Sequence, residues 1–339
     1  MPDRNERTIR FLSRNMALIL LVTTFLFFAL FAPNFLSVYN IRSILKGSSL
    51  SGIAAIGFTL IIILGQLDLS IGAVLMLSGM LCIGLQPSLG WAGSMAAAVL
   101  SGTVIGLVNG LLVARAKINS FVVTLGTQII TFGIMHLYSR GGSLHVADFT
   151  LADWLDKPVL LLFTPMTLIT LTLVLISAFL LTQTGTGRSF FIVGGSPESA
   201  WLAGLHRDRY IIAGFILCGG LAALGGALFA ISISSMTSYA ILGSKTLMQV
   251  ISAVIIGGTL MTGGRGSIIK SYFAVLFLIA INNGIGCFGL GFEVQIFING
   301  LILALVVLYE AWSVNHYNKR VGRRPDLMKN LDKKGAPYE

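Results

Sequence analysis

Apolar stretches of about 20 residues recur along the whole chain, and they limit what it can fold into more than any other feature. A helix of that length crosses a hydrocarbon core about 30 Å thick. Soluble domains carry roughly 25% charged residues, whereas this chain carries 11% and is 55% apolar. Because lipid offers the backbone no hydrogen-bond partner, such segments span as helices. The sequence therefore predicts an all-α polytopic membrane protein.

The hydropathy pattern predicts ten spans, and the distribution of Lys and Arg predicts their orientation. An even number of spans places both termini on one side of the membrane. Of the 23 Lys and Arg residues, 18 lie on that side and 5 on the other, so both termini are expected to be cytoplasmic. Arg42 and Lys46 lie on the outer side and run against this trend, unless they belong to a surface helix. The predicted spans are 16–36, 48–64, 70–86, 91–113, 120–138, 159–181, 210–233, 247–261, 268–286 and 294–312.

These spans divide the chain into three parts. We expect a basic cytoplasmic N-terminus over 1–15, a transmembrane domain over 16–312 with a long cytoplasmic loop at 182–209, and a basic cytoplasmic tail over 313–339. The net charge of +10 lies in the termini and in loops beside spans. It therefore indicates contact with the lipid bilayer and no nucleic-acid partner. The cysteines and histidines show no ligand spacing, so no metal site is expected.

Short sequence patterns also suggest how the helices are arranged. The run 53–56 is followed by Gly65, and the similar run 251–254 is followed at the same distance by Gly263. In our topology both run from outside to inside, so they suggest a weak parallel internal repeat. Three glycines four residues apart predict a close helix contact: Gly102, Gly106 and Gly110.

Asp68 is the only acidic residue between Glu6 and Asp148, and it lies between two apolar segments. One interpretation makes it the N-cap of the next helix, with Leu69 opening that helix, because Asp is a preferred cap. The other makes it an ion or substrate site, since acids inside membranes are costly and usually functional. We favour the cap. The surrounding motif supplies the residues of a helix break: Gly65, Asp68, Ser70 and Gly72.

The loop 182–209 contains signals for a short helix over Pro197–Ala203. Ser196 is a good N-cap and Pro197 suits the first helical position. Glu198 follows in the first turn, where its charge favours the helix dipole, and Gly204 can end the helix in a left-handed conformation. An isolated helix this short is marginal in water. We therefore expect it to be held by packing on its own spans or in the groove of a partner.

Several uncharged polar residues lie inside predicted spans. Their amides and hydroxyls could line a pathway for a hydroxylated solute, or they could bond between helices. The residues are Asn109, Thr124, Gln128, Asn282 and Asn283. Of these, Asn282 and Asn283 are the strongest candidates for pathway lining.

The sequence lacks the signatures of an enzyme that acts alone. The phosphate-binding pattern G-x-x-x-x-G-K-[ST] and the zinc pattern H-E-x-x-H are absent, and no nucleophile elbow is convincing. We therefore expect no catalytic residue in this chain and no cofactor bound to it.

Four ordered blocks carry a family resemblance over some 200 residues. Glu198-Ser199-Ala200-x-x-x-Gly204 is similar to the E-A-A-x-x-x-G motif of ABC importer permeases. GQLDLSIG at 65–72 resembles G-G-I-D-L-S-V-G, with departures at Gln66 and Leu67. The segments 109–127 and 256–267 also resemble family blocks, whereas Lys270 departs from the pattern. The chain thus resembles the ribose/monosaccharide-type ABC importer permeases, the inner-membrane components of binding-protein-dependent transport systems.

This resemblance implies a function and a set of partners. The helix at 197–203 would be the coupling helix that docks into a cytoplasmic ATP-binding subunit, with Glu198, Ala200, Trp201 and Gly204 at the contact. That subunit would use ATP, a periplasmic or extracellular binding protein would deliver the solute, and a second permease, identical or different, would complete a bacterial inner-membrane importer. The solute stays open among pentoses, hexoses and small polyols. The alternative is an ion-coupled secondary transporter that uses Asp68.

Overall fold

The computed structural model describes residues 15–159 and 161–322. Six of its helices are long and apolar enough to cross a membrane, and three shorter helices are also apolar. This confirms the all-α polytopic class. The long helices are α3 (Val38–Ile63), α4 (Ile71–Ala114), α5 (Ser120–Ser139), α7 (Pro165–Gln183), α10 (Arg207–Ser232) and α12 (Ile268–Cys287). The other elements are α2 (Met16–Phe31), β1 (Ser143–His145), α6 (Thr150–Asp156), α8 (Gly185–Gly195), α9 (Pro197–Leu202), β2 (Ser235–Thr237), α11 (Ala240–Ile256) and α13 (Phe292–Gly322).

Helix α4 joins two of the predicted spans. Its 44 residues contain one non-helical position, Gly90, with φ 64° and ψ −179°. The two arms fold back on each other, so that Asn109 Nδ2 on the second arm donates to Ser70 Oγ, at the start of the first, over 3.0 Å. Gly90 can take a positive φ without steric cost, which permits the reversal. The arms on either side of it correspond to the predicted spans 70–86 and 91–113.

The second arm of α4 packs closely against α10 through the predicted glycine stripe. A Cβ on Gly106 would lie 2.2 Å from the backbone oxygen of Phe215, and one on Gly102 would lie 2.4 Å from that of Gly219. At these distances no larger residue fits without moving the backbone. The prediction of a close helix contact at Gly102, Gly106 and Gly110 is confirmed.

Helix α3 forms the centre of the bundle and is nearly all buried over its second half. It contacts α7, α10, α11 and α12. It begins at Val38 and not at 48 as predicted, so Arg42 and Lys46 lie on its first turns and not on a separate surface helix. Their charges find partners there. Lys46 Nζ lies 2.5 Å from Asp156, and Arg42 Nε donates to the backbone oxygen of Leu161 over 2.8 Å.

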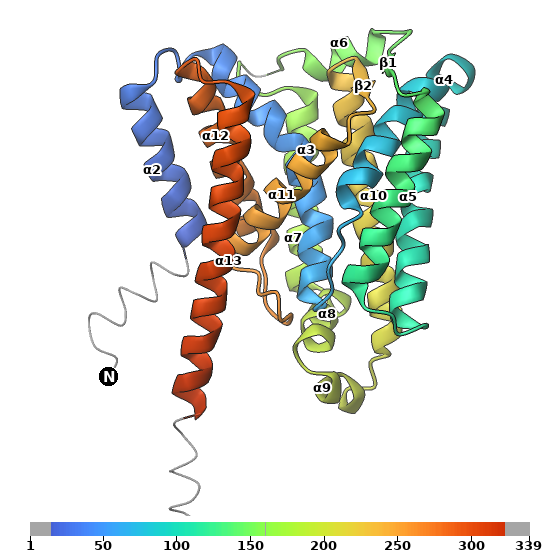
Figure 1. Ribbon diagram of the computed structural model, residues 1–339, viewed down its shortest axis with the longest axis vertical. Coiled ribbons are helices and arrows are strands. Elements are labelled where there is room, and N and C mark those ends of the chain that lie inside the picture. Colours follow the sequence, from blue (N-terminus) through green and yellow to red (C-terminus); the bar gives the residue numbers. More distant parts are fainter. Residues whose placement is uncertain (1–14, 160, 323–339) are drawn as a thin grey trace, which may run out of the picture.

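Figure 1 shows two differently built ends, which we call the α6 end and the α9 end. The α6 end carries α6 and the antiparallel pair β1–β2, with Leu144 opposite Met236. There Asp148 accepts from Thr150 and from the Trp91 indole, and these hydrogen bonds, those from Thr150 first, lower its pKa. The α9 end carries α8 and α9, and the last described residues of α13 extend to the same side.

Two of the predicted chain divisions fall at the margins of the described residues. The predicted N-terminal segment 1–15 lies outside them except for its last residue. Helix α13 continues beyond the predicted span end at 312 to Gly322, and the rest of the predicted tail lies outside the described residues. The three-part division therefore stays a prediction.

Candidate functional site

The short helix α9 forms as its sequence signals predict. Ser196 Oγ accepts from the backbone N–H of Ser199 over 3.1 Å, and Pro197 occupies the first turn. The helix ends at Leu202, one residue before the predicted end. Gly204 takes a φ of +68°. Its N–H donates to the Trp201 oxygen and that of Leu205 donates to the Ala200 oxygen, as in other helices that end in a left-handed glycine.

Helix α9 presents opposite faces to the protein and to solvent. Ala200 is 1% exposed, whereas Trp201 is 79% and Leu202 is 78% exposed. Glu198 is also exposed. Two adjacent large apolar side chains outside the apolar spans form a surface suited to binding another protein.

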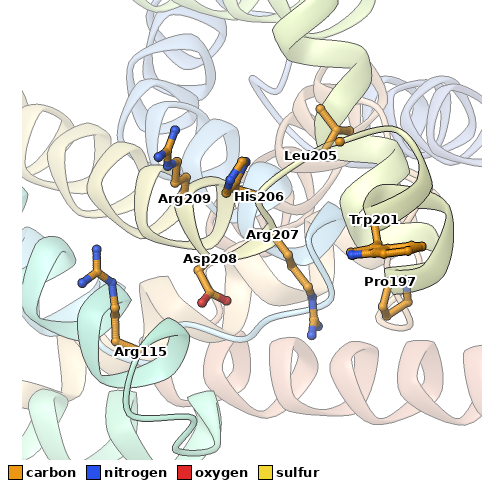
Figure 2. A pocket seen from close by; sticks show the side chains of 9 residues that line it. Arg115, Pro197, Trp201, Leu205, His206, Arg207, Asp208 and Arg209 are labelled. Atoms are coloured by element: carbon orange, nitrogen blue, oxygen red, sulfur yellow. The ribbon is translucent and has the colours of Figure 1, made fainter.

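Beside this apolar surface lies an open pocket of about 710 Å³ whose charged lining residues are mostly basic (Figure 2). Arg115 comes from the end of α4, Trp201 from α9, and Arg207 and Arg209 from the start of α10. Asp208 also lines it, but its charge is already balanced by Lys117 Nζ at 2.7 Å. Apolar and cationic groups thus meet at one place, which suits an acidic and apolar contact from a partner.

A junction of glycines joins this region to the membrane helices. We call Gly65, Gly194, Gly195, Gly263 and Gly264 the glycine junction. A Cβ on Gly194 would lie 1.7 Å from the backbone oxygen of Ile63, and one on Gly264 would lie 2.5 Å from Cα of Gly195. The N–H of Gly264 donates to the same oxygen of Ile63 over 2.8 Å. The end of α8, the end of α3 and the loop before α12 therefore touch backbone to backbone, next to the segment that carries Asp68.

The structure corrects the prediction that Asp68 caps a helix opened by Leu69. Helix α4 begins at Ile71, and Ser70 directly before it has φ −72° and ψ −13° and makes no side-chain capping hydrogen bond. The Asp68 carboxylate accepts from the N–H of Ser70 over 2.9 Å and from its hydroxyl over 2.5 Å. It thus makes a cap-like bond, but in the turn before the helix.

Asp68 belongs to a network of polar groups that we call the Asp68 cluster: the buried Asp68, Ser70 and Asn109, and the half-buried Thr127. The Asn109 amide donates to Ser70 Oγ over 3.0 Å and accepts from Thr127 Oγ1 over 2.7 Å. Asp68 is 1% exposed. The N–H of Leu69, next to it, donates to Thr124 Oγ1 over 3.0 Å. These bonds tie the broken segment to α4 and α5.

The five polar residues predicted to line a pathway fall into separate places. Asn109 and Thr124 lie in or beside the Asp68 cluster, and Gln128 lies half-buried on α5. Asn282 and Asn283 lie on α12, where Asn283 Nδ2 donates to the Ile279 oxygen of its own helix over 3.2 Å. The structure brings Asn282 together with a residue that the sequence analysis missed, Asn299 of α13, whose Nδ2 donates to Asn282 Oδ1 over 3.0 Å.

Asn282 and Asn283 line a polar pocket of about 400 Å³ among the α2–α3 connection, α12 and the start of α13. We call it the amide pocket. Its other lining residues are Asn34, Ser37, Tyr39, Asn40, Gly286, Cys287 and Gln295. A signal for Asn299 existed in the sequence, because Gln295 and Asn299 lie four residues apart on an apolar helix and so share one face.

Comparison with known proteins gives one family and a consistent group of relatives. A family model described as the permease component of the branched-chain amino acid transport system matches residues 40–308. The ribose import permease protein RbsC of Escherichia coli K12 is 29% identical, over 91% of this chain and 97% of that protein. The L-arabinose permease AraH and the D-allose permease AlsC of the same strain are 32% and 31% identical, over 87% and 86% of this chain and 89% of each relative. No solved structure matches the chain.

Proposed function

This chain belongs to the monosaccharide-type ABC importer permease family, and from that membership we propose that it forms the translocation pathway for a monosaccharide-like solute. A separate subunit hydrolyses the ATP that drives import. The chain's relatives carry ribose, D-allose and L-arabinose in their names, which supports a pentose or hexose. The protein lies in the bacterial inner membrane as a multi-pass permease.

The exposed face of α9 is the observation that carries the coupling role. Trp201 and Leu202 stand in solvent beside a pocket rimmed by Arg115, Arg207 and Arg209. The glycine junction links this loop directly to the end of α3 and to the loop before α12. The backbones touch directly at the glycine junction, with no flexible side chains between them. A movement imposed on α9 by an ATP-binding subunit would therefore be transmitted to the broken segment at Asp68 and to the start of α12.

The topology proposed with this function has ten spans and both termini in the cytoplasm. It counts the two arms of α4 separately and adds the shorter apolar helices α2, α11 and α13 to the long ones. The α9 end then faces the cytoplasm, and the α6 end faces outward to meet a solute-binding protein. A second permease subunit completes the importer, and the parallel repeat that relates 53–56 to 251–254 belongs to the same proposal.

The function is tested with Trp201→Ala/Leu202→Ala in membranes that also hold the ATP-binding subunit and the binding protein. We expect recruitment of the ATP-binding subunit to fall roughly tenfold or more, because exposed aromatic residues dominate such contacts. ATP-driven uptake of D-ribose, D-allose or L-arabinose should fall with it. Pull-down and radiolabelled uptake are the measurements.

Trp154→Ala is the matched control for recruitment, because Trp154 is an exposed tryptophan at the opposite, α6 end. It should leave binding of the ATP-binding subunit unchanged. Normal recruitment and uptake in the Trp201/Leu202 variant would make α9 a simple connector. Uptake driven by an ion gradient without ATP would replace this proposal with the Asp68-coupled transporter.

A further inference from the structure

The amide pair Asn282–Asn299 has unused hydrogen-bonding capacity. The two side chains are 8% and 5% exposed, and a single bond of 3.0 Å joins them. Within 15–159 and 161–322, Asn282 Nδ2 and Asn299 Oδ1 are buried without a partner. Buried amide groups are nearly always bonded, so an open donor and an open acceptor on two amides that are joined by a hydrogen bond need an explanation.

One hydroxyl group matches this pair. A hydroxyl donates one hydrogen bond and accepts others, so it can donate to Asn299 Oδ1 and accept from Asn282 Nδ2 together. A carboxylate only accepts and an ammonium only donates, and each would leave one amide atom unsatisfied. The pair therefore favours an uncharged, hydroxylated ligand.

The amide pocket beside the pair has the same character. Its lining, to which Asn282 belongs, consists of amides, hydroxyls, backbone and a thiol, with no charged residue among those that line it. Its volume of about 400 Å³ lies in the range of small-molecule sites. Two of its amides are held in place. Asn40 Nδ2 donates to the Phe35 oxygen over 2.8 Å, and Gln295 Oε1 accepts from Lys245 Nζ over 3.3 Å.

The pocket lies at the α6 end, where the α2–α3 connection meets the end of α12 and the start of α13 (Figure 1). In the proposed topology this end faces the side from which solute arrives. We propose that the amide pocket is an outer solute-binding subsite, in which one hydroxyl of a monosaccharide bonds to Asn282, which lines the pocket, and to Asn299, which is bonded to it, once the groups that cover these two buried atoms move aside. This inference rests on the proposed function and names the residues that recognise its substrate.

Cys287 provides a direct assay, because it lines the pocket while the other two cysteines, Cys82 and Cys218, are fully buried. Maleimide labelling of Cys287 is measured on the purified full chain with D-ribose, D-allose or L-arabinose. At a concentration about ten times Kd, a bound sugar should slow labelling roughly tenfold. Trimethylamine N-oxide at equal concentration, which has no hydroxyl, should not slow it.

Asn282→Leu and Asn299→Leu should abolish this protection, and Asn299→Ser serves if either fails to fold. Thr103→Val is the matched control, because its hydroxyl bonds only the Val99 oxygen of its own helix, and it should keep full protection. Absence of protection by all three sugars, as expected if the pair binds only water, would overturn the subsite. Equal protection in the Asn variants would overturn it as well.

The subsite and the proposed function fail in distinguishable ways. ATP-driven uptake by the wild-type importer without protection of Cys287 leaves the function standing and removes the subsite. Protection that is lost in both Asn variants, in a chain that imports no sugar with its partners, establishes the subsite and removes the importer assignment.

Discussion

The Asp68 cluster and the amide pair are both small groups of polar side chains buried among apolar helices. In the Asp68 cluster the Ser70 hydroxyl and both amide atoms of Asn109 have protein partners within 3.0 Å. In the amide pair one donor and one acceptor stay open. The hydrogen bonds of the Asp68 cluster hold the broken segment against α4 and α5, whereas the amide pair has one donor and one acceptor free for a ligand. Burial and residue type alone do not separate these roles.

Asn109→Leu should have the largest effect on stability. It removes two hydrogen bonds at a fully buried position and leaves groups of Ser70 and Thr127 less well bonded, so we expect a loss of about 2–4 kcal/mol in the free energy of unfolding. Denaturant unfolding in detergent measures it. Unchanged stability would mean that the Asp68 cluster does not stabilise the fold, and its contrast with the amide pair would not hold.

The amide pair should behave differently when its members are replaced together. Asn299→Leu alone leaves Asn282 Oδ1 without its bond, which should cost about 1–3 kcal/mol. Replacing both asparagines by leucine removes both polar partners, which can be nearly neutral, so the double variant should be more stable than the single one. The same unfolding assay decides. A double variant less stable than the single would show that the pair is structural, like the Asp68 cluster.

Asp68→Asn should have the smallest effect. An asparagine oxygen can still accept from the N–H and hydroxyl of Ser70, so we expect a change of roughly 1 kcal/mol or less and retained uptake. Asp68→Leu, which cannot accept, is the contrasting variant and should lose stability. If the Asn variant inserts and assembles but transports nothing, the carboxylate has a chemical role and the Asp68 cluster is more than a structural tie.

Local signals were sufficient for part of this molecule. The apolar runs predicted the helical membrane class, the glycines at 102, 106 and 110 predicted a close helix contact, and Ser196, Pro197 and Gly204 predicted α9. Each of these depends on residues within a turn or two of one another. The predicted start of α3 was wrong although a local signal was present, since Ser37 caps the helix by accepting from the N–H of Asn40. The partners of Arg42 and Lys46, Leu161 and Asp156, lie more than 100 positions away, and no local signal indicates them.

The sequence by itself determined that polar residues interrupt the apolar helices, and which ones. Only the tertiary structure decided which of them are satisfied. The partner of Ser70 lies 39 positions away on the returning arm of α4, and the partner of Asn282 lies 17 positions away on α13. A hydrogen bond requires two atoms about 3 Å apart in the right orientation, and the order of residues along a chain does not specify that separation once the chain has turned back on itself.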